Sequence, residues 1–311
     1  MCRWRGSLEA RPENLFVPVM VGRRVGILAL WALVLLLGFV VAALCAGEWL
    51  SHPATRTIGT PPKDFSAREV RIDTAPAGHV AGWFAPGQRG RGAVLLLHGV
   101  RSDRTQMLGR ARFLNREGYA ALLIDLPAHG QSTGDRITFG AREAAGVKAA
   151  LEFLRRESPG ERTAVIGVSL GAAATVLALP SPAPDAVVLE SMYPTIEHAV
   201  TNRLTTVLGP AGAVLAGPLL WQLPLRAGVS TSDLRPIERI ARLGAPALIA
   251  SGAQDLHTTW AETEQLFDAA AGPKELWRVE GAGHLDLHAY GPGAYERRVL
   301  GFLGRHLRDG G

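Results

Sequence analysis

Gly167 and Gly171 flank Ser169 in the stretch GVSLG, which follows an apolar run and precedes the helix-forming sequence AAATVLAL. A sharp turn from a strand into a helix needs glycines, because side chains would collide there, and the turn raises the serine hydroxyl above the sheet. The N–H groups at the start of the following helix favour negative charge at the same point. Ser169 is therefore predicted to be a nucleophile; a buried serine in a tight turn is the alternative.

A serine hydroxyl becomes a good nucleophile only when a neighbouring base takes its proton. The histidine best placed for this is His284, in the loop EGAGHLDL after the last predicted strand. Three other histidines are weaker candidates because they lie in or near predicted helices: His257, His288 and His306.

A third group must orient the imidazole of the base. Asp255 follows the apolar run 247–251 in the sequence SGAQDLHT and is predicted to do this, with Glu190 as a reserve candidate. The order Ser169, Asp255, His284 is one of the chain orders in which a catalytic triad occurs. All three residues follow predicted strands, and an open α/β sheet builds its site at the carboxyl ends of its strands.

The tetrahedral intermediate of acyl transfer needs two N–H donors for its oxyanion. Leu170, directly after the nucleophile, is predicted to supply one, and Val100 in the loop LLLHGVRSDR the other. Gly99 lets the backbone turn inward there. His98 is interpreted as a residue that braces this loop rather than as a base.

The elements around these residues alternate between short apolar runs and longer amphipathic segments. This alternation predicts a doubly wound α/β domain with a mostly parallel sheet, and the first two strands could form an antiparallel hairpin at its edge. The predicted strands are 67–72, 79–84, 93–97, 120–125, 163–167, 186–189, 247–251 and 275–279, and the predicted helices are 103–117, 140–157, 170–179, 260–271 and 293–308.

Residues 192–236 interrupt the alternation, and the segment 204–225 within them carries no charge. Gly209–Pro210 and Gly217–Pro218 argue against one straight spanning helix. We expect a small apolar cap over the site, in contact with lipid or close to it. The alternative is a pair of ordinary helices packed on the edge of the sheet.

Near the N-terminus, residues 25–47 contain no charge and are long enough to span the hydrocarbon of a bilayer, which is ~30 Å thick. Arg23 and Arg24 precede this segment and Glu48 follows it, so the positive-inside rule predicts a cytoplasmic N-terminus and an extracytoplasmic domain. A cleaved signal peptide starting at Met20 is the alternative, and it would make the protein secreted. Residues 48–66 are interpreted as a linker.

The net charge of +5 does not predict a nucleic-acid partner, because much of it falls in the basic tail 1–24 before the apolar segment. The two cysteines, Cys2 and Cys45, lie outside the predicted α/β domain, which leaves that domain without a disulfide or thiolate metal site. A lipoprotein site at Cys45 is disfavoured because Leu44 occupies a position where a small residue is usual. No metal or organic cofactor is expected.

Together, these motifs resemble the α/β-hydrolase superfamily over about residues 67–308. The resemblance is carried by LLLHG (95–99), DLPAHGQS (125–132), GVSLG (167–171), SGAQD (251–255) and GAGH (281–284). The stretch VVLESMYPTI (187–196), combined with the N-terminal apolar segment, is similar to membrane-anchored α/β-hydrolase-domain proteins, a group of esterases, lipid hydrolases and protein depalmitoylases. One departure is Thr259, where a proline commonly follows the acid loop.

The resemblance implies hydrolysis of carboxylic esters or thioesters through an acyl-enzyme, and the membrane segment favours acyl or lipid substrates. Two alternatives stay open. The same three residues would serve a peptidase related to prolyl oligopeptidase, and a membrane-tethered binding protein could retain the fold without the activity.

Overall fold

The computed structural model of the chain describes residue 1 and residues 17–74 and 78–308, with the side chains of 17–25 excepted. It divides into two units, Met1–Ala46 and Gly47–Gly311. Most of the predicted basic tail 1–24 therefore lies outside the described residues.

The first unit is formed by the helix α1 (Val17–Ser51), which contains the predicted segment 25–47 and ends inside the second unit. Its large apolar side chains are exposed, Leu28, Trp31 and Leu35 among them. Exposed apolar side chains on every face of a helix require an apolar surrounding, because water would solvate them unfavourably. Gly26–Ser51 is long and apolar enough to cross a membrane, so α1 is a candidate membrane span, and a signal sequence meets the same criterion.

The second unit is built on an eight-stranded sheet with the strand order β10-β9-β8-β7-β4-β5-β3-β2. Its strands are parallel except at one edge, where β2 pairs antiparallel with β3 and β3 pairs antiparallel with β5. The predicted strands and the predicted hairpin edge are thus confirmed. The strands are β2 (Arg68–Asp73), β3 (His79–Ala85), β4 (Ala93–Leu97), β5 (Ala120–Ile124), β7 (Thr163–Val168), β8 (Ala186–Glu190), β9 (Ala247–Gly252) and β10 (Lys274–Val279).

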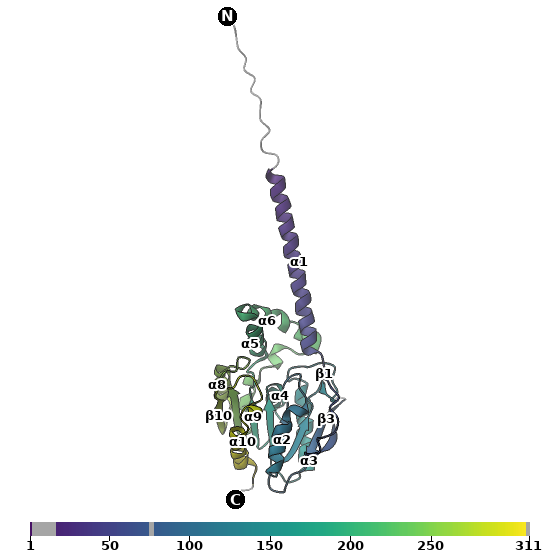
Figure 1. The fold of residues 1–311 in the computed structure, drawn as a ribbon, viewed down its shortest axis with the longest axis vertical. Coiled ribbons are helices and arrows are strands. Elements are labelled where there is room, and N and C mark those ends of the chain that lie inside the picture. The colour runs from purple at the N-terminus through teal and green to yellow at the C-terminus, as the bar shows by residue number, and fades with distance from the viewer. Residues whose placement is uncertain (2–16, 75–77, 309–311) are drawn as a thin grey trace. The chain divides into compact units, whose positions relative to one another are not determined.

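Helices cover both faces of this sheet (Figure 1). Successive side chains of a strand point to opposite faces, so Ala93, Leu95 and Leu97 of β4 enter one apolar core while Val94 and Leu96 enter the other. The doubly wound fold is therefore confirmed. The first core contains α3 (Glu143–Glu157), α4 (Leu170–Ala178) and α8 (Trp260–Ala269), and the second contains α2 (Leu108–Arg116) and α10 (Pro292–Leu307).

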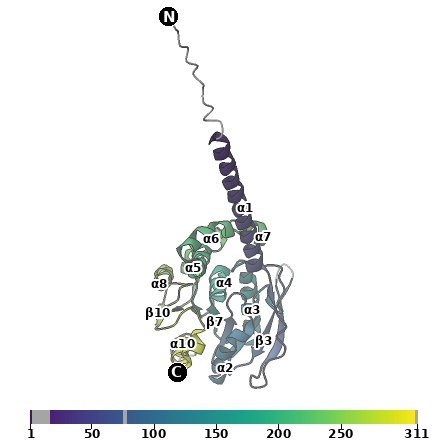
Figure 2. The same cartoon turned by 45° about the horizontal axis from the view of Figure 1, so that its top comes forward.

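A group of short helices separates β8 from β9, where the uncharged segment was expected to form a cap. Figures 1 and 2 show its helices α5 and α6 beyond one end of the sheet rather than on its faces. The chain reverses at Gly209–Pro210, and Gly212 lies so close to the backbone of Leu204 that a Cβ there would be 2.3 Å from the Leu204 carbonyl oxygen. The cap helices are α5 (Ile196–Leu208), α6 (Gly212–Leu220) and α7 (Leu223–Ala227), followed by three 3₁₀ turns (Thr231–Asp233, Pro236–Glu238 and Ile240–Arg242).

The segment 48–66, expected to be a linker, is part of the second unit. It begins with the last residues of α1, where the Glu48 carboxylate pairs with Arg136 (Nη1–Oε1 2.6 Å) and with Arg226. Farther on, the two-residue strand β1 (Ala54–Thr55) pairs in parallel with β6 (His129–Gly130). The interpretation as a linker was therefore wrong in its first half, because a carboxylate after an apolar segment gave no sign of its two arginine partners.

The close packing of α4 on β4 can be tested at Gly171. A Cβ at this position would lie 2.6 Å from the Leu97 carbonyl oxygen, a backbone atom that cannot easily move. We expect Gly171→Ala to lower the free energy of unfolding by ~1–3 kcal/mol or more, as overpacking does.

Gly217→Ala is the matched control, because a Cβ there meets nothing within 4 Å. It is expected to leave stability unchanged or to raise it by up to ~1 kcal/mol through helix propensity. Thermal unfolding of the full chain in detergent micelles, followed by tryptophan fluorescence, measures both variants. Equal stabilities would contradict this description of the helix–strand contact.

Candidate active site

Ser169 occupies a strained turn between β7 and α4. Its φ of 50° and ψ of −106° lie outside the regions that non-glycine residues usually adopt. The turn is held by a hydrogen bond from the Ser169 N–H to the Glu190 carbonyl oxygen (2.8 Å). Gly167 is needed because a Cβ there would lie 2.6 Å from the Ala172 nitrogen. The Ser169 side chain is only half-buried, so a substrate can approach it.

Asp255 and His284 are joined by a hydrogen bond of 2.8 Å between Oδ2 and Nδ1. The Asp255 carboxylate also accepts the hydroxyl of Thr258 (2.8 Å) and the N–H groups of His257 (2.8 Å) and Thr258 (2.9 Å). Burial alone would raise the pKa of Asp255, but the hydrogen bonds from His284 and Thr258 outweigh it and lower that pKa. Asp255 is therefore a buried carboxylate that stays ionised.

The carboxylate fixes the tautomer of His284. Because Nδ1 carries the proton donated to Asp255, Nε2 is left to accept a proton from another group. The His284 side chain is 22% exposed, so that nitrogen remains accessible. Within the described residues no hydrogen bond joins His284 to the Ser169 hydroxyl, a bond that in unliganded enzymes is often long and tightens when substrate binds.

The three residues predicted to form a catalytic triad lie at the same end of the sheet. Strands β7, β8, β9 and β10 are parallel neighbours, so their carboxyl ends meet there. Ser169 directly follows β7, Asp255 follows β9 and His284 follows β10. The structure thus brings Asp255 and His284 into contact and sets Ser169 at the same edge.

The role suggested for Glu190 as a reserve orienting acid is contradicted. Its carboxylate is buried and pairs with the Arg110 guanidinium (Nη2–Oε2 2.6 Å), and it also accepts the Tyr295 hydroxyl. Arg110 and Tyr295 come from helices α2 and α10, which share a core on the same face of the sheet. The side chain of Glu190 therefore serves that cluster and not the imidazole of His284.

Sequence reasoning did not reveal that the cluster of Arg110, Glu190 and Tyr295 also holds the loop that carries His284. Arg110 also binds Asp286 (Nη1–Oδ1 2.9 Å), which lies two residues beyond His284 and caps the short helix α9 (Leu287–Tyr290). Burial alone would lower the pKa of Arg110, but Glu190 raises it above its ordinary value, so the guanidinium stays charged. The Arg110 cluster thereby ties the loop that carries His284 to the end of β8.

The three histidines that were weaker candidates for the base have other neighbours. The His257 ring packs against the His284 ring, with centroids 4.9 Å apart. His288 pairs with Glu296 (Nε2–Oε1 3.2 Å), and His306 packs against Phe302. None of the three contacts Asp255 through its ring, which agrees with their lower rank in the sequence.

In the loop after β4, two neighbouring N–H groups have hydrogen-bond partners and the one between them has none among the described residues. The Gly99 N–H donates to the Gln106 side chain (2.8 Å), and the Arg101 N–H donates to Nε2 of His129 (3.1 Å). The Val100 N–H between them has no hydrogen-bond partner among the described residues. Gly99 lies beside Ser169, since a Cβ at Gly99 would be 3.8 Å from the Cβ of Ser169.

Leu170, predicted to be the second donor, directly follows Ser169. It is the first residue of α4, and the first N–H groups of a helix have no carbonyl partner within that helix. The two donors predicted from sequence, Val100 and Leu170, thus flank the turn that carries Ser169.

His98 braces the loop, as interpreted from the sequence. Its buried ring bonds to the Gly99 carbonyl oxygen through Nδ1 (2.7 Å) and accepts the Leu126 N–H through Nε2 (2.9 Å). Burial, with a smaller contribution from the neighbouring His129, lowers the pKa of His98 to about 3. Both ring nitrogens are occupied and the ring is neutral, so His98 is not a base for catalysis.

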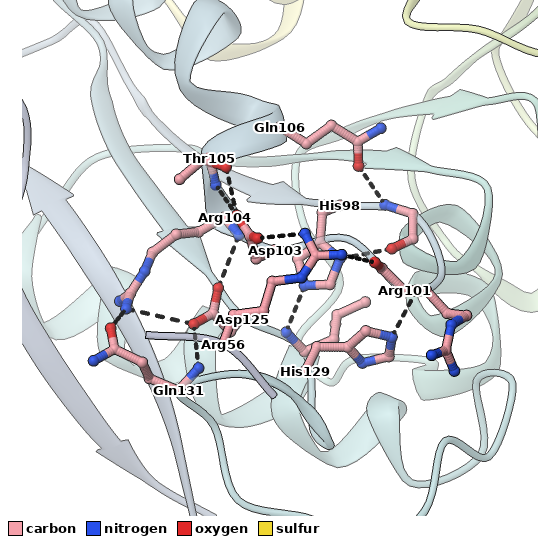
Figure 3. A network of polar contacts seen from close by, with 12 residues as sticks. Arg56, His98, Arg101, Asp103, Arg104, Thr105, Gln106, Asp125, His129 and Gln131 are labelled. Carbon is pink, nitrogen blue, oxygen red and sulfur yellow. Dashed lines mark hydrogen bonds and ion pairs between the residues drawn. The ribbon is translucent and has the colours of Figure 1, made fainter. Parts of the chain in front are cut away.

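A wider polar network surrounds this loop (Figure 3). Asp125, just beyond β5, accepts the N–H groups of Arg104 (2.8 Å) and Gln131 (2.8 Å). Asp103 pairs with Arg56 (3.2 Å), a residue of the segment that had been expected to be a linker. The loop is therefore fixed from both sides before any substrate binds. Across the described part of the chain, no group of three His, Cys, Asp or Glu side chains could hold a metal ion.

The neutral state of His98 predicts how stability depends on pH. Its pKa is about 3 when folded against 6.5 for the ordinary side chain, so between these values the unfolded chain binds more protons. Stability should therefore fall as pH is lowered from about 6.5, with a slope of up to ~1.4 kcal/mol per pH unit from this residue.

His98→Asn removes this titration. We expect the variant to be less stable at pH 7 and to lose less stability than the wild type between pH 6.5 and 4. Urea unfolding at stepped pH values measures both slopes. Parallel curves for the two proteins would show that His98 is not held neutral.

The Arg110 cluster can be tested by removing its cation. Arg110→Met leaves the buried carboxylate of Glu190 without its ionic partner and is expected to cost ~3–5 kcal/mol of stability. Arg116→Met, on the same helix, is the control, because Arg116 is exposed and its ion pair with Glu296 is 3.6 Å long. Such a surface pair contributes ~0–1 kcal/mol. Thermal unfolding would contradict the role of Arg110 if both variants lost the same amount.

Comparisons with known proteins agree with this architecture. A family model described as serine aminopeptidase, S33 matches residues 88–216. An uncharacterized protein of Mycobacterium tuberculosis is 34% identical over 226 residues, which cover 71% of this chain and 73% of that protein. An uncharacterized protein of Bacillus subtilis is 23% identical over 216 residues, covering 68% and 70%.

Solved structures show the same fold. An esterase of Pyrococcus furiosus superposes with a TM-score of 0.69 at 24% identity and covers 83% of this chain and 98% of its own. A proline iminopeptidase of Mycobacterium smegmatis has a TM-score of 0.58 at 15% identity and covers 76% and 98%. These relatives agree with two features of the structure: the strained turn after a central parallel strand, and the acid and histidine that follow later strands. The chain belongs to the α/β-hydrolase superfamily.

Proposed function

We propose that this protein is a serine hydrolase that cleaves carboxylic ester or thioester bonds through an acyl-enzyme intermediate. The observation that carries the proposal is the 2.8 Å hydrogen bond between Asp255 and His284, at the sheet edge where the strained turn exposes Ser169. Membership of a superfamily of hydrolases and the fold shared with an esterase support it.

The geometry suggests a role for each group. The Ser169 oxygen attacks the substrate carbonyl carbon while Nε2 of His284 takes the hydroxyl proton. The carbonyl oxygen becomes an anion that the N–H groups of Val100 and Leu170 stabilise. His284 then gives the proton to the leaving alcohol or thiol, and a water molecule repeats the sequence to release the acid.

The apolar helix α1 supports a membrane location for this activity. We propose the orientation that the flanking charges favour, with the N-terminus in the cytoplasm and the hydrolase domain on the other side. The substrates expected there are esters or thioesters with an acyl chain. Peptide cleavage by the same three residues is the competing activity, suggested by the description of the family model.

Replacing the nucleophile tests the proposal. Ser169→Ala should abolish labelling by a fluorophosphonate probe and lower the hydrolysis of p-nitrophenyl butyrate by at least ~10⁴-fold, because the remaining groups have no nucleophile to activate. Ser232→Ala, at an exposed serine of the cap, should leave both unchanged.

Each outcome separates the alternatives. Absence of labelling in the wild type would favour a membrane-tethered binding protein, and labelling that persists in Ser169→Ala would overturn the assignment of the nucleophile. An aminoacyl p-nitroanilide included in the same assay distinguishes a peptidase, which would turn it over faster than the ester.

A further inference from the structure

Arg101 directly follows Val100 in the loop after β4, and its backbone adopts an uncommon conformation. Its φ is 58°, in the left-handed region that residues other than glycine seldom occupy. Such a conformation persists only where the surrounding structure holds it. The Val100 N–H, proposed above to be an oxyanion donor, belongs to the preceding residue, so the groups that fix Arg101 also limit how that N–H can turn.

The side chain of Arg101 is held by the end of α1 and the residue after it. Its guanidinium lies over the Trp49 ring, 4.4 Å from the ring centroid. Its Nη1 donates to the carbonyl oxygens of Trp49 (2.8 Å) and His52 (3.3 Å). The Trp49 carbonyl is one of the last four of α1, which have no partner within the helix, so the guanidinium also caps this helix.

The backbone groups of Arg101 have partners as well (Figure 3). Its carbonyl oxygen accepts Nη2 of Arg56 (3.2 Å), whose Nη1 pairs with Asp103 farther along the loop. Its N–H donates to Nε2 of His129 (3.1 Å). Nδ1 of His129 bonds to the Pro127 carbonyl oxygen (2.9 Å), which leaves Nε2 as the acceptor.

His129 is in turn positioned by the segment that follows α1. It is the first residue of β6, which pairs in parallel with β1, and the Arg56 N–H extends this pairing by donating to the Gly130 carbonyl oxygen (2.8 Å). The N–H, the carbonyl and the guanidinium of Arg101 are therefore each bound by residues 49–56 or by the strand with which these residues pair.

We propose that residues 49–56 form a clamp that acts through Arg101 to hold the Val100 N–H in place for the oxyanion, which makes Arg101 a positioning residue for hydrolysis. The inference rests on the proposed function and adds to it the groups that fix the loop after β4. Attachment of α1 alone would affect only stability. A clamp on an oxyanion donor acts on the transition state, because the hydrogen bond to the oxyanion is strongest there.

Substitutions of Arg101 test the clamp in the full-length protein in detergent micelles. Arg101→Ala and Arg101→Gly should each lower kcat for p-nitrophenyl butyrate by at least ~10-fold and leave KM unchanged, since loss of a whole oxyanion donor costs ~10²–10³-fold. Glycine adopts a positive φ without strain. An Arg101→Gly variant as active as the wild type would therefore show that the guanidinium contacts are not needed.

Arg68→Ala is the matched control for these substitutions. The Arg68 guanidinium also lies over an aromatic ring, that of Phe84, at 5.2 Å from the centroid. It belongs to the edge strand β2, which is separated from β4 by β3 and β5. Its removal should leave kcat and KM as they are in the wild type.

The contribution of Trp49 is measured by a double-mutant cycle. Trp49→Ala removes the ring beneath the guanidinium and should lower kcat ~2–5-fold, the size expected of an exposed cation–π contact. Trp49→Phe keeps a ring and should retain most of the activity. In the Arg101→Ala background Trp49→Ala should have no further effect, because the ring acts only through Arg101. Additive losses would show that Trp49 acts by another route and would overturn the clamp.

A second measurement does not depend on hydrolysis. Hydrogen–deuterium exchange of the full-length protein, followed by mass spectrometry, reports on the amides of residues 97–106. Arg101→Ala and Trp49→Ala should each speed exchange in this segment and leave exchange in α10 as it is in the wild type, because only the loop is released. Unchanged exchange in residues 97–106 would contradict the clamp.

The outcomes separate the two proposals. A wild type that hydrolyses esters, with Arg101 variants that keep its kcat or change only KM, overturns the clamp and leaves the proposed function standing. A wild type that hydrolyses no ester overturns the proposed function, and the exchange of residues 97–106 then decides whether the clamp exists. Faster exchange in α10 as well would show that a variant is unfolded, and Arg101→Gly and Trp49→Ala then decide.

Discussion

The site depends on how closely α4 approaches β4 and β7. Ser169 can hold a positive φ only because Gly167 and Gly171 leave room where a Cβ would meet backbone atoms at 2.6 Å. The strain is balanced by the buried strands on both sides, which fix the turn. Asp255, His284 and the loop after β4 all lie at the end of the sheet where this turn places the Ser169 hydroxyl.

Two polar clusters hold the loops on either side of the turn. On one side, Gln106 and His129 accept the N–H groups of Gly99 and Arg101, and on the other, Arg110 ties Asp286 to the end of β8. Each cluster is at least partly buried and well paired, which makes it costly to rearrange. The loop after β4 and the loop that carries His284 are thus fixed in place by the fold itself.

Much of this fold could be predicted from sequence, because buried parallel strands appear as continuous apolar runs and glycines mark the turns between them. The bounds of β4 were predicted in full, and those of β7 to within one residue. The Asp255–His284 contact could be predicted because both residues follow strands whose ends must meet.

Contacts between side chains that are far apart in the chain could not be predicted. Arg110 on an amphipathic helix has the same appearance as an exposed arginine, and Glu190 looked available for catalysis because its neighbours on α2 and α10 were far away in the chain. Glu48 was misassigned to a linker for the same reason.

The ion pairs of Glu48 make the last residues of α1 part of the folded domain. Proteolytic release of the domain from a membrane normally leaves an ectodomain intact, because the stalk that is cut contributes nothing to the folded part. Here a cut between Leu50 and Pro53 would remove Glu48 and Leu50 and leave Arg136 and Arg226 without the carboxylate that they share. A form truncated in this segment would therefore lack part of the native domain, and shortened fragments should begin before Gly47 to preserve it.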